Sequence, residues 1–121
     1  MFYLGAILLI GIGITHSYLG EQYILIRLFR LDKLPKLFGS TEFTKNTLRF
    51  AWHLTTIAWF GFAALLLHLS GGNLDIKVIG NIIGGTFILH SVFALIGSKG
   101  KHFSWPVFLV IGLTSFYASN A

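Results

Sequence analysis

Long apolar stretches with almost no charge limit the fold of this chain more than any other feature. Four occur, at about residues 2–20, 50–69, 74–97 and 103–118. Each approaches the roughly 20 residues that a helix needs to cross about 30 Å of hydrocarbon. Hydrocarbon offers the backbone no hydrogen-bond partners, so helices are the expected form. The sequence predicts a single all-α integral membrane domain over residues 1–121, a four-transmembrane-helix bundle.

The overall composition agrees with a membrane location. Charged residues make up only 11% of the 121 residues and hydrophobic residues 55%, whereas soluble domains carry roughly 25% charge. This excludes a typical soluble enzyme and a disordered segment. The chain has no cysteine, so it has neither a disulfide nor a thiolate metal site. Its net charge of +5 does not indicate nucleic-acid binding, because the basic residues lie beside the apolar stretches, where they meet anionic lipid headgroups.

The positions of the basic residues predict the orientation. Eight of the nine lie in the first or the third connection between the stretches: Arg27, Arg30, Lys33, Lys36, Lys45, Arg49, Lys99 and Lys101. The second connection holds only Lys77, beside Asp75. Basic loops face the cytoplasm, so the N- and C-termini are expected outside. The uncharged N-terminal stretch lacks the basic start and cleavage site of a signal peptide, and a retained first span is expected.

The first connection also contains an amphipathic cytoplasmic segment. Leu28 and Leu31 share one helical face, while Arg27 and Arg30 lie on another. Proline disrupts a helix interior, so this helix is expected to end at Pro35. The next helix is expected to start near residue 41.

Histidines are the ionisable residues that lie within the spans. His16, His53 and His90 occupy the first, second and third stretch, and the predicted orientation places all three in the cytoplasmic half. Small residues share their helical faces, as is typical of faces where membrane helices pack closely. Ionisable groups in a membrane are costly and often functional. We therefore expect the three imidazoles to point toward a shared bundle axis.

Three converging imidazoles indicate a cofactor site. Imidazole is a ligand for Zn, Cu, Fe and Ni and an axial ligand for haem. The sequence predicts a transition-metal site formed by His16, His53 and His90, with Glu21 as a fourth metal ligand, or a haem b held by two of the histidines. Glu21 lies about 140° from His16 on a regular helix, so it joins this site only if the helix breaks at Gly20. The role of such a site would be redox chemistry, sensing or metal handling.

Two other functions fit the same residues. In one, the histidines only tie helices together in a non-catalytic membrane partner or assembly protein. In the other, His53 is the titrating gate of a small transporter or pore, because histidine changes charge near neutral pH. Gly80 and Gly84 form a GxxxG pattern, which suits a contact within the chain or between copies in a homo-oligomer. The sequence leaves open whether the chain is an enzyme.

Three strings carry a resemblance to other proteins. HSYLGEQYIL, LPKLFG and LRFAWHLTTIAWFGFAALL resemble sequences from an uncharacterised group of small bacterial four-span inner-membrane proteins. The resemblance covers most of the chain and implies four helices in a bacterial inner (cytoplasmic) membrane. It assigns no role to any residue.

Overall fold

A computed structural model describes residues 1–121, and its secondary structure is helical without strands. Helix α1 (Phe2–Leu19) continues through a π-helix, η1 (Gly20–Leu25), into the short α2 (Ile26–Leu28). Helices α3 (Glu42–Ser70), α4 (Ile76–Gly97) and α5 (Ser104–Asn120) follow. The all-helical prediction is confirmed. Three helices are long and apolar enough to cross a membrane: Phe2–Leu28, Glu42–Ser70 and Ile76–Gly97.

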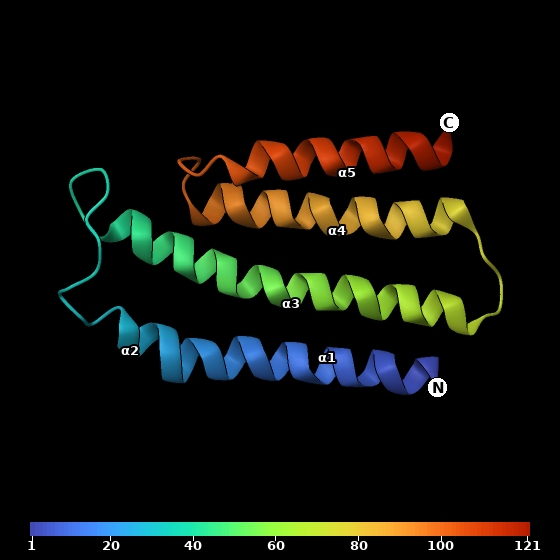
Figure 1. Ribbon diagram of the computed structural model, residues 1–121, viewed down its shortest axis with the longest axis horizontal. Helices are drawn as coiled ribbons and strands as arrows, with labels where there is room; N and C mark the ends of the chain where they lie inside the picture. The colour runs from blue at the N-terminus through green and yellow to red at the C-terminus, as the bar shows by residue number, and fades with distance from the viewer.

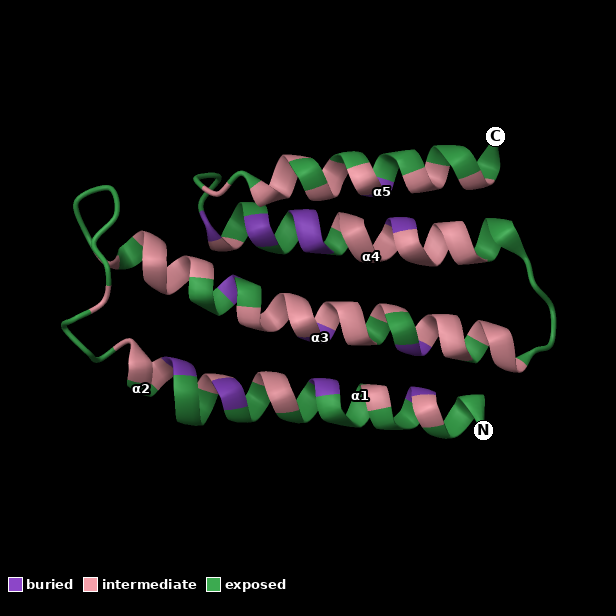
Figure 2. Cartoon of the chain, viewed as in Figure 1, coloured by how far each residue is buried: buried purple, intermediate pink, exposed green.

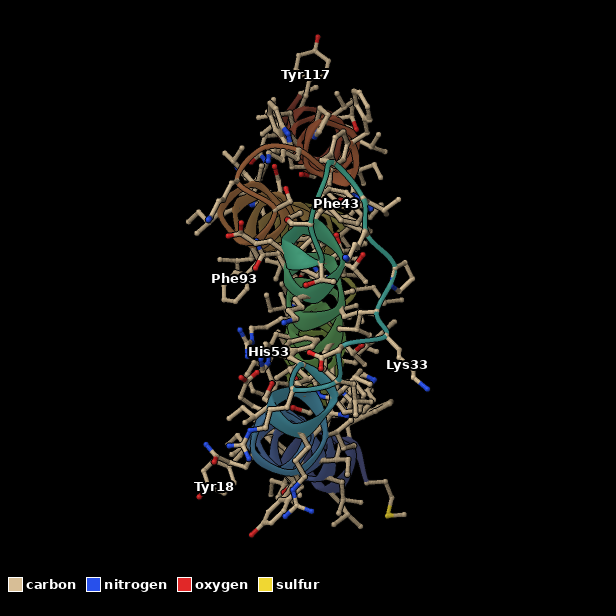
Figure 3. The ribbon with its side chains drawn as sticks, turned by 90° about the vertical axis from the view of Figure 1, so that its left-hand side faces the viewer. Tyr18, Lys33, Phe43, His53, Phe93 and Tyr117 are labelled. Carbon is tan, nitrogen blue, oxygen red and sulfur yellow. The ribbon has the colours of Figure 1, made fainter.

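The helices lie side by side in one layer. Helix α1 packs against α3, α3 against α4, and α4 against α5, and no other pair of these four is in contact. Figure 1 shows the row from its broad side, and Figure 3 shows the same helices stacked in a narrow column. Only 13 of the 121 residues are buried, and Figure 2 shows them scattered in short patches along the helices. The expected packing around a shared bundle axis is therefore wrong, because a row has no common axis.

The two ends of the layer differ in charge. Both termini and the connection between α3 and α4 lie at one end (Figure 1). The connection before α3 and the connection before α5 lie at the other end, where eight of the nine basic residues are located. The positively charged connections predicted to share one side of a membrane therefore share one end of the molecule.

The first helical segment is shorter than the sequence pattern predicts. It ends at Leu28 rather than at Pro35. Leu25 is its last buried residue, and packing supplies most of the stability of a helix in a protein. From Phe29 to Thr41 no residue is buried, although Arg49 of α3 lies over the ring of Phe29. Helix α3 begins at Glu42 after Thr41, close to the predicted start.

Small residues bring α4 and α5 together. A Cβ added to Gly80 would lie 2.3 Å from Cβ of Ser119, and one added to Gly84 would lie 3.1 Å from the carbonyl oxygen of Gly112. Only glycine permits such close approach of two helices. The GxxxG pattern therefore forms a contact within the chain.

Candidate functional site

His16 and Trp52 join α1 to α3 through a reciprocal pair of hydrogen bonds. Nε2 of His16 donates to the carbonyl oxygen of Trp52 at 3.3 Å, and Nε1 of Trp52 donates to that of His16 at 3.0 Å. The rings stack with their centroids 4.4 Å apart and their planes 2° from parallel. Gly20 makes room for the indole, since a Cβ there would lie 2.1 Å from Nε1 of Trp52. His16 thus ties two helices together.

His53 lies on the α3 side of the same helix contact and faces side chains of α1 and η1. Its Nε2 lies 3.2 Å from Oε2 of Glu21, and its Nδ1 lies 2.9 Å from Oγ of Ser17. Arg49 binds both carboxylate oxygens of Glu21, with Nε 3.2 Å from Oε2 and Nη2 2.8 Å from Oε1. Such bidentate Arg–carboxylate contacts fix the geometry of the carboxylate. The side chains of His53 and Glu21 are 24% and 25% exposed, so the cluster is half-buried.

A chain of hydroxyl groups leads from His53 deeper into the helical layer. Ser17 Oγ lies 2.6 Å from Oγ1 of Thr56, which in turn lies 3.2 Å from the carbonyl oxygen of Gly13. Thr56 is only 7% exposed. Hydrogen-bonded groups therefore connect the half-buried Glu21 to a buried contact between α1 and α3.

The direction of this chain depends on the protonation of His53. A neutral His53 that donates Nε2–H to the carboxylate of Glu21 has an acceptor at Nδ1. Ser17 then donates its only hydroxyl proton to Nδ1 and accepts from Thr56. A charged His53 donates from Nδ1 instead, so Ser17 donates to Thr56 and Thr56 donates to the carbonyl of Gly13. The last hydrogen bond therefore forms when Nδ1 of His53 carries a proton, as it does in the charged imidazole.

The spacing of residues on each helix explains this cluster. Ser17 and Glu21 are four residues apart, as are Arg49 and His53, so each pair shares one helix face. His16 lies on the other side of the contact, against Trp52. The sequence placed Glu21 beside His16 only if the helix broke at Gly20. The helix does not break at Gly20 but widens into η1, and Glu21 contacts His53 and Arg49.

His90 lies in a different part of the layer. Its Nδ1 donates to the carbonyl oxygen of Thr86 at 2.8 Å within α4. Its ring lies between those of Phe87 and Phe108, each with its centroid 5.4 Å away, and the residue is 8% exposed. Because Phe108 belongs to α5, His90 packs in the contact between α4 and α5, away from the contact between α1 and α3.

The predicted set of three imidazole ligands is therefore not assembled. No group of three or more His, Cys, Asp or Glu side chains is placed to hold a metal ion. The physical reason is the single-layer fold, in which the first and third spans do not touch. His16 of α1 and His53 of α3 lie in one helix contact, while His90 lies in the contact between α4 and α5.

Sequence reasoning missed the partners that define this cluster. The contacts of Ser17 and Trp52 and the pairing of Arg49 with Glu21 were not predicted. The sequence did contain one signal for the cluster, because it has two polar pairs at four-residue spacing. Thr56 also belongs to the chain of hydroxyl groups.

No protein-family model, curated protein or solved structure matches the chain.

Proposed function

We propose that the chain is a four-span protein of a bacterial inner membrane that responds to pH through His53. In this proposal the termini lie outside and the basic connections lie in the cytoplasm. The fourth span is α5, whose 17 residues extend about 25 Å. The even number of spans and the charge asymmetry support this orientation together.

One observation carries the proposed response to pH. His53 lies between an acidic group and a hydroxyl chain, and the hydrogen bond from Thr56 to Gly13 requires a proton on Nδ1, which the charged imidazole supplies. Histidine is the side chain that ordinarily gains or loses charge near neutral pH. Protonation of His53 therefore changes the contact between α1 and α3 at a buried position, which is a mechanism for a sensor or a gate.

The charged groups around His53 come from both packed elements. Glu21 of η1 and Arg49 of α3 are in direct contact with each other, and Glu21 also contacts His53. Lys99 lies across a groove between α3 and α4, which His53 also lines. In this proposal His53 is the one group of the cluster whose charge changes with pH, while Glu21, Arg49 and Lys99 stay charged.

Isotope-edited infrared spectroscopy of the full chain in lipid bilayers tests this proposal. With ¹³C at the carbonyl of Gly13, we expect its stretching band to move to lower wavenumber as the pH falls from about 8 to about 5, because Thr56 begins to donate to it. His53→Gln should abolish the movement, whereas His68→Gln, at the other end of α3, should leave it intact. A band that does not move, or that moves equally in His53→Gln, would refute the proposal.

A bound transition metal or haem b stays a prediction from the sequence. Within one chain its three expected ligands are divided between two helix contacts, so the geometry favours a pH response at His53 over a cofactor held by His16, His53 and His90. An absorption spectrum and elemental analysis of the purified protein check for haem and for Zn, Cu, Fe or Ni.

A second candidate role for the histidines is to hold the helices together, and their contacts favour it. His16 and His53 bind across one helix contact, and His90 packs in another. A membrane partner or assembly protein would use its histidines in this way. The infrared experiment distinguishes the two roles, because purely structural histidines do not reorganise the bond at Gly13.

A further inference from the structure

An open groove lies between α3 and α4 at the end with the basic connections. It has a volume of 410 Å³ and includes the side chains of His53 and Phe93 in its lining. Figure 3 shows that His53 and Phe93 project to the same side of the helical layer. The floor of the groove is the crossing of the two helices, where a Cβ on Gly97 would lie 2.6 Å from Cβ of Phe50.

The groove has a positive mouth. Arg49 and Lys99 both line it, together with Asn46, and the lining contains no carboxylate. The carboxylates of Glu21 and Glu42 pair with these two cations from outside the groove.

Both cations can accept a further anionic partner. Lys99 and Glu42 are 66% and 62% exposed, and exposed ion pairs are weak, so an anion can compete for Lys99. Arg49 uses only its Nε and Nη2 groups on Glu21, which leaves further N–H donors unpaired on its guanidinium.

The groove becomes apolar with depth. Phe93 lies four residues before Gly97, the last residue of α4, and therefore about 6 Å from the basic end of that helix, beyond which Lys99 follows. Ile96 lies between them and is 71% exposed. An occupant would therefore meet cations near the membrane surface and hydrocarbon side chains below, which is the order of groups in a phospholipid.

We propose that this groove binds one anionic phospholipid, with its phosphate at Lys99 and Arg49 and an acyl chain along Phe93 and Ile96. The proposal rests on Lys99 and Arg49 and does not require a charge on His53, which also lines the groove. Anionic lipids are attracted generally to basic connections, but a groove with a cationic mouth and an apolar floor predicts a single retained molecule. A soluble phosphate ester carries the same headgroup chemistry, and the experiment separates the two sources.

Native mass spectrometry of the full chain, released from micelles with added lipid, tests this proposal. We expect phosphatidylglycerol to be retained at one molecule per chain in preference to phosphatidylcholine. Lys99→Gln should weaken that retention about fivefold, the effect of one cation near an anionic surface. Asn46→Asp, a nearly isosteric change, should also weaken it by adding a negative charge at the mouth.

Lys77→Gln is the matched control, since it removes the same charge from the opposite end of the same helical layer. It should leave retention within about twofold of the parent chain, because the surface potential falls off within a Debye length. Glycerol 3-phosphate at the same concentration should not displace the lipid. Equal retention of the two lipids, equal effects of Lys77→Gln and Lys99→Gln, or displacement by glycerol 3-phosphate would each overturn the proposal.

Discussion

At the scale of single residues, Ser17 is the group that makes the contact between α1 and α3 sensitive to His53. It is the only hydroxyl that lies within hydrogen-bond distance of both the imidazole and Thr56. Its single proton can go to one of them at a time. In the proposed response to pH, Ser17 is therefore the group that transmits the charge state of His53, whereas Glu21 contacts the other side of the ring and is itself held by Arg49.

Ser17→Ala should leave the protonation of His53 intact but remove its effect on the carbonyl of Gly13. We expect the ¹⁵N signals of the His53 ring still to change with pH, since Glu21 continues to accept from Nε2. The infrared band of the Gly13 carbonyl should no longer respond, because no hydroxyl connects Nδ1 to Thr56. The loss of its two interhelical hydrogen bonds, to His53 and Thr56, should lower the free energy of unfolding by about 1 kcal/mol, since one such bond contributes about 0.6 kcal/mol on average.

Thr15→Val is the control for Ser17→Ala. The Thr15 hydroxyl bonds only to the carbonyl of Gly11 in its own helix, so its removal should leave the response of Gly13 to pH unchanged. A response that persists in Ser17→Ala would mean that His53 acts on α1 by another route.

At the scale of helices, η1 and its first residue determine how closely α1 and α3 approach. Gly20 lies directly against Trp52, and the wider turn that follows places Glu21 beside His53. π-Helical turns are rare and often occur at functional sites. The close contact and the polar cluster thus share one short segment of the first span.

Gly20→Ala should destabilise the protein by about 1–3 kcal/mol, the usual cost of forcing an extra methyl group into a packed contact. The new Cβ would meet the Trp52 ring at 2.1 Å, so α1 or the indole must shift. Thermal denaturation in micelles measures the change in stability. Gly11→Ala is the control, because its Cβ would have nothing within 4 Å. An equal effect of the two substitutions would contradict the packing role of Gly20.

The limits of sequence reasoning are clearest for these same elements. Apolar length was enough to predict helices, and Gly80 and Gly84 indicated a close helix contact, because both properties are local. The choice of partner for each helix is not local. Small residues share the helical face of His90, as they share that of His16, yet His90 packs against α5 because the helices form a row. Likewise, the helical phase of Glu21 predicted its separation from His16, but not its pairing with Arg49 on a helix 28 residues later in the chain.

At the scale of the whole molecule, a single layer leaves both broad faces apolar. Large exposed side chains such as Ile7, Phe62 and Ile96 are 59–71% exposed, which is unfavourable in water but suits contact with acyl chains. The charge asymmetry then determines how the layer is inserted. Eight basic residues at one end oppose translocation of that end, which is the reason for proposing that the termini lie outside.

The location of the C-terminus tests both the orientation and the fourth span. An alkaline phosphatase fused after Ala121 should be active, because it is expected outside the cytoplasmic membrane, and a green fluorescent protein at the same position should be dark. The same reporters fused after Gly100, before α5, should show the opposite pattern. If α5 lay along the surface instead of crossing, the two positions would behave alike, because nothing between them would traverse the bilayer. If α5 crosses but the basic end is outside, both patterns would be reversed, so one set of fusions distinguishes a missing span from an inverted protein.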